Sequence, residues 1–521
     1  MTNPSTLYRG GVLLCPADPN ATALLVSGGR ITWLGVDADA PAADRVVDLD
    51  GALVTPAFVD AHVHATDTGL ALSGLDLSGV RSAGELLDAV AGFAAGLPAD
   101  AVVLGHGWDE STWGASPLPD ADALERAAGG RRVYLSQASI HSALVSRAML
   151  AAVAEVVAAA GYDESGWLRR DAHHVVRAAA FASVTRGQRV AAQRVALAHA
   201  ASLGVAAVHE CGGPEISDEE DFTGLLGISG AGVPEVYGYW GELGGAARAR
   251  ELGAVGAGGD LFADGALGSR TAHLSQPYLD GDGAGHGYLS AEQVREHLLD
   301  CAAHGLQGGF HAIGDAAIGT VLEGFAGAVR QLGVERVRAA RHRIEHAEIM
   351  DKRLIAGFVE YGIVASMQPA FDRLWGGAGR MYESRLGLAR SLASNPMGAM
   401  HGVGVALAFG SDSPVTPVDP WGSVRAAAAH HSPAQRMSVR AAFAAHTRGG
   451  WRAVHLDNEG VLALGAPATF AVWDTPAGVD RNLPVLLAED PELRGPQDPT
   501  PLPVCRRTVL RGDVIYEEGS A

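Results

Sequence analysis

Short apolar runs alternate with helical patterns through the central part of the chain, from Pro56 to about His455. The helical patterns include SAEQVREHLLDCAAHG, GTVLEGFAGAVRQLG and VRAAFAAHTRGGWRAVH, in which apolar residues recur at spacings of three and four. Strands that alternate with helices of this length predict a parallel sheet. Eight such units would close into a (β/α)8 TIM barrel, so the fold class we expect is α/β with a distorted barrel at its centre.

The apolar runs offer more strands than one barrel needs. The candidates are residues 58–64, 102–106 or 133–137, 205–209, 233–239 or 259–264, 308–311, 342–346, 363–367 and 405–410. We interpret the surplus as a large insertion at about residues 66–180, and we expect this insertion to form a cap over the barrel mouth. The barrel domain as a whole is predicted to span residues 56–460.

The two ends of the chain share a different pattern. Before Pro56, segments such as ALLVSGGRITWLGV alternate apolar residues with glycine turns, and the later segments TFAVWD and RRTVLRGDVIYEEG do the same. This pattern is typical of strands and hairpins. We therefore predict one small β-sandwich built jointly from residues 1–55 and 461–521, with the barrel inserted between them.

Composition restricts the possible binding partners more than it restricts the possible folds. The chain has 521 residues, of which 48% are hydrophobic, so it can bury a large core. A formal net charge of −20 repels phosphate backbones and anionic membranes, which disfavours nucleic acid and membrane partners. The first residues, MTNPSTLYRGG, lack the apolar stretch of a secretory signal, so we expect a cytoplasmic protein. The expected partner is a small-molecule substrate, and an exposed apolar face of the sandwich would favour a homodimer.

Four patches of the predicted barrel end in residues that can hold a divalent metal. They are AFVDAHVH with His62 and His64, LQGGFHAIGD with His311, RHRIEHAE with His346, and VALAFGSDSPV with Asp412. Side chains on a strand repeat every second residue, so the two histidines of the His-x-His pair lie on one side and can reach one ion. The functional residues of a barrel gather at the carboxyl ends of its strands. The pattern therefore predicts a metal centre at one rim of the barrel.

His346 has a second interpretation. His342, Glu345 and His346 fit the H-x-x-E-H pattern of inverzincin metalloproteases, in which a helix carries both histidines on one face. The segment RHRIEHAE instead alternates charged and apolar residues, which favours a strand. On a strand, His342 would share the face of His346 one layer deeper, and Glu345 would point away from that face. A zinc peptidase that uses this motif stays open as an alternative.

Two of the candidate ligands also have structural explanations. A single histidine at the end of an apolar strand, such as His311, is often a satisfied core residue. Asp412 precedes Pro414 in a turn, where it could act as a helix N-cap or form an Asx turn. In a functional role, Asp412 could hold a metal and exchange a proton with water, which is the combination that metal-assisted hydrolysis needs.

Several longer motifs, taken together, resemble the amidohydrolase superfamily and, within it, the amidohydrolase family 3 branch that includes relatives of N-substituted formamide deformylase. The matching segments are TPAFVDAHVH, GHGWDESTW, FADGALGSRTAHLSQPY, HAIGDAAI, RIEHAE and FGSDSPV, and the likeness covers nearly the whole chain. The resemblance implies a distorted (β/α)8 barrel with a flanking β-sandwich. It also implies metal ligands at His62, His64, His311 and His346, with Asp412 as both ligand and proton shuttle.

One position departs from that family pattern. In many relatives the strand that enters the FADG motif carries a lysine, which becomes carbamylated and bridges two metals, whereas this chain has Asp260 there. Aspartate carries its carboxylate on a single methylene, so Asp260 could bridge two ions only if the backbone moved inward or a water filled the gap. We therefore expect one tightly held ion, with zinc favoured by the imidazole and carboxylate ligands, and a second site as an open alternative.

Loops around the predicted rim carry candidate substrate contacts. Asp264 and Arg270 lie in the glycine-rich segment DGALGSRT, where Arg270 could bind a carboxylate or carbonyl of the substrate or could form a structural ion pair with Asp264. Trp108 and Trp113 fall in the predicted insertion, where they could line an apolar pocket or pack in a core. His141 in SIHSALVS is equally ambiguous.

The predicted chemistry is hydrolysis of a non-peptide C–N bond, as in an amide or N-substituted formamide. A metal would activate water, Asp412 would accept its proton and pass it to the departing nitrogen, and His346 could help to polarise the carbonyl. Besides the zinc peptidase, a non-catalytic metal-binding barrel stays open, because Asp260 replaces the family's lysine.

Overall fold

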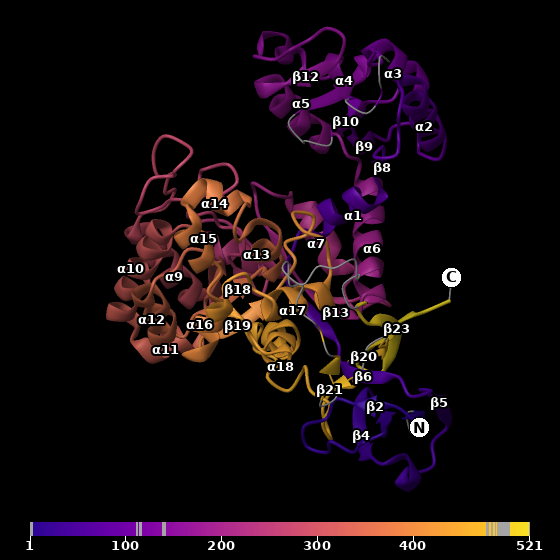
Figure 1. Ribbon diagram of the computed structural model, residues 1–521, viewed down its shortest axis with the longest axis vertical. Coiled ribbons are helices and arrows are strands. Elements are labelled where there is room, and N and C mark those ends of the chain that lie inside the picture. Colours follow the sequence, from indigo (N-terminus) through magenta and orange to yellow (C-terminus); the bar gives the residue numbers. More distant parts are fainter. Residues whose placement is uncertain are drawn as a thin grey trace. The chain divides into compact units, whose positions relative to one another are not determined.

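The computed structural model describes residues 4–110, 113, 117–137, 142–475, 479–480, 483–484, 486 and 501–519. The chain divides into two compact units, Met1–His64 together with Leu197–Ala521, and Ala65–Ala196. The first unit contains a parallel barrel and the two sheets of a sandwich, and the second contains a five-stranded sheet with its own helices (Figure 1).

Eight parallel strands form the barrel of the first unit. In chain order they are β7 (Phe58–Val63), β13 (Val205–Gly212), β14 (Glu235–Trp240), β15 (Gly256–Ala257), β16 (Gln307–Ala312), β17 (Arg343–His346), β18 (Val364–Met367) and β19 (Ala406–Phe409). Strands that are covered on both faces are apolar along most of their length. This explains the near-continuous apolar runs in the sequence, since β7, β13 and β16 are buried at every position.

The barrel closes between its first and last strands, just beyond β19. The Asp412 N–H donates to the His62 carbonyl at 2.8 Å, and the His64 N–H donates to the Ser413 carbonyl at 2.9 Å. Gly410 permits this approach, because a Cβ there would lie 2.4 Å from the His62 nitrogen. The predicted fold class, a distorted (β/α)8 barrel with a β-sandwich, is therefore confirmed.

The predicted position of the second barrel strand was wrong. Residues 102–106 and 133–137, one of which was expected in the barrel, belong instead to strands β9 (Val103–Trp108) and β10 (Val133–Gln137) of the second unit. Both are apolar because they lie inside the sheet of that unit, so composition alone did not distinguish them from barrel strands. The run at 259–264 follows the short strand β15, and within it Phe262 forms an isolated bridge with His311.

Helices follow the barrel strands along the chain. They are α7 (Glu219–Gly227), α8 (Ala246–Glu251), α9 (Ala291–His304), α10 (Asp315–Leu332), α11 (Val334–Ala339), α12 (Lys352–Tyr361), α13 (Pro369–Trp375), α14 (Met381–Leu386), α15 (Leu388–Ala393), α16 (Met397–Gly402), α17 (Pro420–Ala428), α18 (Val439–Ala444) and α19 (Gly450–Ala453). Helix α9 begins with a capping box between Ser290 and Gln293 and ends at Gly305, whose φ is 67°. Two predicted helices lie in α9 and α10, and the third runs from α18 to α19 through a π-helical turn, Ala445–Gly449.

The sandwich is assembled from both ends of the chain. One sheet has the order β4 (Arg30–Gly35), β3 (Ala23–Ser27), β1 (Ser5–Arg9) and β5 (Arg45–Asp48), and the other has β2 (Val12–Leu13), β6 (Leu53–Pro56), β20 (Phe470–Asp474), β23 (Val504–Leu510) and β24 (Asp513–Glu517). Strand β6 pairs antiparallel with β20. Tyr8 from the first sheet packs edge-on against Phe470 from the second, with ring centroids 5.1 Å apart, so the two termini share one core.

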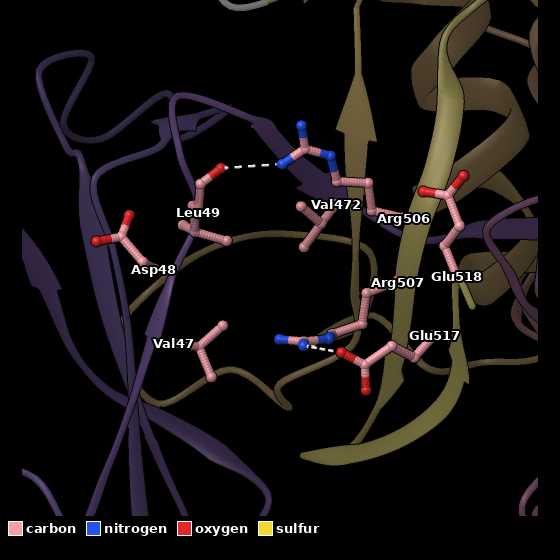
Figure 2. Close-up of a pocket in the computed structure, with 8 residues that line it drawn as sticks. All are labelled: Val47, Asp48, Leu49, Val472, Arg506, Arg507, Glu517 and Glu518. Atoms are coloured by element: carbon pink, nitrogen blue, oxygen red, sulfur yellow. Dashed lines mark hydrogen bonds and ion pairs between the residues drawn. The ribbon is translucent and has the colours of Figure 1, made fainter. Parts of the chain in front are cut away.

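A small open pocket of about 170 Å³ lies at one side of the sandwich (Figure 2). Its two arginines already have protein partners. Arg506 donates to the Leu49 carbonyl at 3.4 Å, and Arg507 pairs with Glu517 (Figure 2). Arg506 also pairs with Asp474. These guanidinium groups are therefore part of the sandwich structure.

The second unit has a sheet in the order β12 (Trp167–Arg169), β11 (Ser142–Val145), β10, β9 and β8 (Leu75–Asp76). Its helices are α1 (Ala65–Ser73), α2 (Ala83–Ala95), α3 (Ala121–Ala127), α4 (Arg147–Ala151), α5 (Arg170–Ala182) and most of α6 (Arg186–Ser202). Two hydrophobic clusters of its own, one around Val103 and one around Tyr134, hold it together. The expectation that the insertion covers the barrel mouth stays a prediction. Among the described residues, every helix is too short or too polar to span a bilayer.

Candidate metal centre

The candidate ligands from the four sequence patches lie at the carboxyl ends of their barrel strands. His62 is near the end of β7 with His64 just after it, His311 is in β16, and His346 is the last residue of β17. Asp412 follows β19 and takes a left-handed φ of 57° at the point where the barrel closes. His62 is fully buried, and Asp412 is 7% exposed.

Asp260 lies at the centre of this group. Its Oδ1 is 3.5 Å from Nε2 of His62 and 3.7 Å from Nε2 of His346, while its Oδ2 is 3.2 Å from Nε2 of His64. Ligand atoms of His62, Asp260 and His346 all lie within 4.8 Å of one another. One short carboxylate therefore faces three imidazoles at once.

Asp412 forms a second group with the His-x-His pair. Its Oδ1 is 3.5 Å from Nε2 of His62 and 3.2 Å from Nε2 of His64. The ligand atoms of these three residues also lie within 4.8 Å of one another. His62 belongs to both groups, so the two groups form one continuous cluster.

A pair of glycines explains how Asp260 reaches the centre. After the two-residue strand β15, Gly258 and Gly259 have φ values of 157° and 78°. A Cβ at Gly258 would lie 2.4 Å from the backbone of Gly309 in β16, and a Cβ at Gly259 would lie 3.1 Å from the Cys211 side chain. Because only glycine allows the chain to run this close to its neighbours, the backbone delivers the short aspartate to the cluster. The expectation of one tightly held ion stays a prediction, and bridging of two ions by Asp260 stays an open alternative.

The prediction for the faces of β17 was wrong. Glu345 was expected to point away from the site, but its Oε2 is 2.8 Å from Nδ1 of His62. His342 points the other way, where its ring packs against Phe325 and its Nδ1 accepts the Gly308 N–H at 2.8 Å. Strict alternation would then turn His346 outward as well. Its left-handed φ of 69° breaks the alternation and lets the ring join the cluster.

The same contacts bear on the peptidase alternative. Residues 343–346 form a strand, whereas an H-x-x-E-H site needs a helix to bring both histidines to one ion. His342 is 2% exposed, and its Nδ1 already accepts a backbone N–H. Burial lowers its pKa to about 4. The motif in this chain is therefore a coincidence of spacing.

A buried charge network borders the cluster. Arg343 donates to both oxygens of Glu345 at 2.6 and 2.8 Å and to Nδ1 of His209 at 2.9 Å. The terminal nitrogen that donates to Glu345 at 2.8 Å also donates to the Ala61 carbonyl and to Ser366, and the guanidinium lies 4.3 Å from the ring centroid of Tyr239. Arg343 and Glu345 are both fully buried. The network fixes Glu345, which in turn orients His62.

The ring orientations leave lone pairs directed at the cluster. A proton on Nδ1 of His62 donates to Glu345, and a proton on Nδ1 of His346 donates to the amide oxygen of Gln368 at 2.8 Å. In both rings Nε2 is then the free acceptor. Nε2 of His62 and Oδ1 of Asp260 are buried and have no hydrogen-bond partner among the described residues. Buried polar atoms are rarely left in this state, so the cluster fits a cation.

The pKa shifts in the cluster also fit a cation-binding site. Burial alone would lower the pKa of His64, but the hydrogen-bonded carboxylates of Asp260 and Asp412 raise it well above its usual range. Burial would raise the pKa of Asp260, but His62, His346 and His64 hold it well below its usual range. Without a cation, protons therefore hold the imidazoles and carboxylates together. A divalent cation would displace those protons, as metals do when they bind histidine.

His311 lies at the edge of the cluster. Its ring centroid is 4.5 Å from that of His346, and its Nδ1 is 3.6 Å from Oδ1 of Asp264. Asp264 is fully buried and accepts the N–H groups of His273, Ile313 and Gly314 at 2.8 to 3.0 Å. Asp264 thus positions the loop after β16 and the ring of His311. Its carboxylate is already occupied by these backbone donors.

A cavity of about 300 Å³ opens onto the cluster. Besides the candidate ligands, its wall is mainly apolar, and it is lined by His64, Asp260, Phe262, Ala266, Leu267, Gly268, His311, Ile313, His346, Glu348, Phe371, Trp375, Met381, Tyr382, Asp412 and Val415. A concave, largely apolar cavity of this size beside a few converging polar groups is typical of a small-molecule site.

One lining residue was missed by the sequence analysis. Glu348 is 2% exposed, and burial raises its pKa to about 7, although hydrogen bonds from Tyr382 and Asn395 act in the opposite direction. In the sequence, Glu348 is the last residue of the segment RIEHAE, two residues after His346. Nothing in that segment marked Glu348 as different from a solvent-exposed residue.

Three other residues that were predicted to contact the substrate have protein partners of their own. Arg270 donates to both oxygens of Asp280 at 3.1 and 3.0 Å, so its partner is not Asp264, and it does not line this cavity. Trp108 and Trp113 belong to the core of the second unit, where their indole N–H groups donate to the carbonyls of Leu135 and Val80. His141 lies outside the described residues.

A parallel barrel with histidines and carboxylates gathered at the carboxyl end defines a (β/α)8-barrel protein with a site suited to a divalent cation. Residues 45–516 match the model of the amidohydrolase family, and the chain belongs to that family. Finer assignment to the formamide deformylase branch stays a prediction.

Individual proteins are similar to this chain over most of its length. YtcJ of Bacillus subtilis is 25% identical over 515 residues, which cover 91% of this chain and 90% of YtcJ. The protein LONG AFTER FAR-RED 3 of Arabidopsis thaliana is 27% identical over 513 residues, 88% of this chain and 84% of its own. Among solved structures, an uncharacterized metal-dependent hydrolase from Pyrococcus furiosus is 25% identical, with a TM-score of 0.75, and the match covers 90% of this chain and 98% of that one.

Proposed function

We propose that this protein is a metal-dependent hydrolase that cleaves a non-peptide C–N bond, in an amide, an N-substituted formamide or a related small molecule. The observation that carries the proposal is the convergence of Nε2 of His62 and Oδ1 of Asp260, both buried and without a hydrogen-bond partner among the described residues, beside a cavity. Membership in the amidohydrolase family and the likeness to the Pyrococcus furiosus hydrolase support it.

The metal would be held by His62, His64, His346, Asp260 and Asp412, with His311 at the edge of the set. Imidazole nitrogens with carboxylate oxygens suit zinc, and we propose one tightly bound zinc ion. When bound, such an ion supplies Lewis-acid polarisation of a carbonyl and lowers the pKa of a water molecule.

Asp412 is the proposed proton shuttle. Its carboxylate lines the cavity, so it can accept a proton from an attacking water and return that proton to the departing nitrogen. His64 is 3.2 Å from its Oδ1 and holds the carboxylate in place. His346 is held through Nδ1 by Gln368, which points Nε2 at the cluster rather than leaving the ring free to move. We therefore propose His346 mainly as a ligand that also contributes to polarising the carbonyl.

The test is metal removal and reloading against a panel of substrates. The purified protein is stripped with a chelator, reloaded separately with zinc, manganese, cobalt and iron, and assayed for amine release from formamides, acetamides and dipeptides. We expect no hydrolysis in the stripped protein and restored hydrolysis of amides or formamides after reloading. Full activity in the stripped protein, or cleavage of dipeptides in preference to the other substrates, would overturn the proposal. Absence of any hydrolysis by loaded protein would favour the non-catalytic barrel.

A further inference from the structure

The cavity beside the metal centre has an uneven distribution of charge. Its lining includes the carboxylates of Asp260, Asp412 and Glu348, and no lysine or arginine is among the described lining residues. Asp260 and Asp412 face the imidazoles of the cluster. Glu348 faces none of them at hydrogen-bonding distance, so it is the carboxylate that the proposed mechanism leaves unused.

The contacts of Glu348 occupy one of its two oxygens. Oε2 accepts the Tyr382 hydroxyl and, at 3.4 Å, the side-chain amide of Asn395. Within the described part of the chain, no hydrogen bond to Oε1 is present. Tyr382 and Asn395 are each 1% exposed, so the pair holds the carboxylate rigidly in the cavity wall. Oε1 is therefore the oxygen that remains available to a ligand in the cavity.

Aromatic rings stand next to this carboxylate. Phe371 and Trp375 have ring centroids 4.7 Å apart, and Trp375 and Tyr382 have centroids 6.2 Å apart. All three rings line the same cavity as Glu348. Aromatic faces attract cations through the ring quadrupole, and rings combined with a carboxylate form the common recognition site for ammonium groups.

We propose that Glu348, Trp375, Phe371 and Tyr382 form an ammonium-binding subsite, so that the substrate is a small amide or formamide carrying a cationic amine. This inference rests on the proposed C–N hydrolase function and names its substrate class. The cation would lie against the aromatic rings and form an ion pair with the Glu348 carboxylate, while the amide faces the metal centre. Substrates with a carboxylate in the same place would meet Glu348 with no basic residue to compensate, so they are expected to bind poorly.

The first experiment compares charge at constant shape. The substrates are the N-formyl derivatives of three amines: (2-aminoethyl)trimethylammonium, its neutral isostere 3,3-dimethylbutylamine, and β-alanine. Each is assayed with the zinc-loaded protein at pH 8.5. We expect kcat/KM for the ammonium compound to exceed that of the isostere by at least about tenfold, because a desolvated cation–π contact and an ion pair act together. The carboxylate compound should be the poorest. Equal kcat/KM values for the first two would overturn the inference.

A binding measurement makes the test independent of catalysis. Choline and 3,3-dimethyl-1-butanol differ in charge but hardly in shape, and neither contains an amide. Isothermal titration of the zinc-loaded protein should give at least about tenfold tighter binding of choline. If no amide is hydrolysed but choline is preferred, the subsite stands and the proposed reaction fails. If amides are hydrolysed without any preference for charge, the reaction stands and the subsite fails.

Substitutions in the cavity wall test whether the preference for a cation comes from these residues. Glu348→Gln keeps the size of the side chain and should reduce the preference for choline, and Trp375→Leu should do so by removing an aromatic face. Glu323→Gln, at an exposed position of α10, is the matched control and should bind both probes as the parent does. Thermal unfolding shows whether Glu348→Gln still folds. If it does not, Trp375→Leu decides, and an unchanged preference in that variant counts against the subsite.

Discussion

Two neighbouring charge clusters in the barrel share His62 but differ in how completely their atoms are paired. In the Arg343–Glu345 network, every described charged group has a partner, and both side chains are fully buried. In the Asp260 cluster, Nε2 of His62 and Oδ1 of Asp260 have no hydrogen-bond partner among the described residues. His62 and Asp260 are also buried, so what distinguishes the two clusters is how completely their polar atoms are hydrogen-bonded. A closed network holds the barrel together, whereas an open one is a site that awaits a ligand.

The largest expected effect comes from the open cluster. Asp412→Asn keeps the shape of the side chain but removes its ability to carry a proton. We expect kcat to fall by about 10² to 10⁴-fold, the usual contribution of general acid–base catalysis. Zinc content, measured by mass spectrometry, should stay at or above half of the parent value because the histidines remain.

The control for this variant is Asp282→Asn, at an exposed position away from the cavity, which should leave kcat unchanged. Hydrolysis by the Asp412 variant at close to the parental rate with metal retained would show that another group moves the proton.

Substitutions in the Arg343–Glu345 network are expected to lower the stability of the fold rather than the rate of catalysis. Arg343→Met leaves Glu345 buried without its main partner, which typically costs about 3–5 kcal/mol of the free energy of unfolding. Urea unfolding of the metal-free protein measures this loss. Replacing both residues, Arg343→Met with Glu345→Met, removes the unpaired charge and should recover part of it. A double variant no more stable than the single one would mean that the network contributes through packing alone.

A smaller effect is expected where the two clusters meet. Glu345→Gln weakens the hydrogen bond that orients His62, and losing such an outer partner of a ligand usually lowers metal affinity by about 10–100-fold. Competition with a fluorescent zinc chelator measures the affinity. Glu360→Gln, exposed on α12, serves as the control. Equal zinc affinity in both variants would show that Glu345 does not contribute to metal binding.

The smallest effect is expected at His342, which lies outside both clusters. His342→Ala should leave zinc content unchanged, because its ring accepts the Gly308 N–H on the opposite side of β17. His346→Ala, four residues later, should reduce zinc content clearly. Loss of zinc in the His342 variant would restore the H-x-x-E-H interpretation.

The sequence predicted those parts of the molecule in which local pattern and position agree. The His-x-His pair on β7 and Asp412 after β19 follow apolar runs, and strand ends in a parallel barrel meet at one rim. The pattern failed where the backbone departs from regular geometry. The positive φ of His346 reverses the expected faces of β17, and the glycines before Asp260 bring a short side chain to the centre.

Two other features depend on contacts between distant segments. Glu348 acquires its environment from Tyr382 and Asn395, which lie more than one element away along the chain. Strands β9 and β10 look like barrel strands because each lies inside a sheet, and only pairing reveals which sheet. Neither property is encoded within a short window of sequence.

The pairing of β6 with β20 has a consequence for biosynthesis. Strands β1 to β6 leave the ribosome first, yet their sandwich lacks its other half until β20 and β23 have been made. At roughly 5–20 residues per second, that interval is on the order of tens of seconds. During this time the early strands present unpaired edges, which are the features of a sheet most prone to pair with other chains.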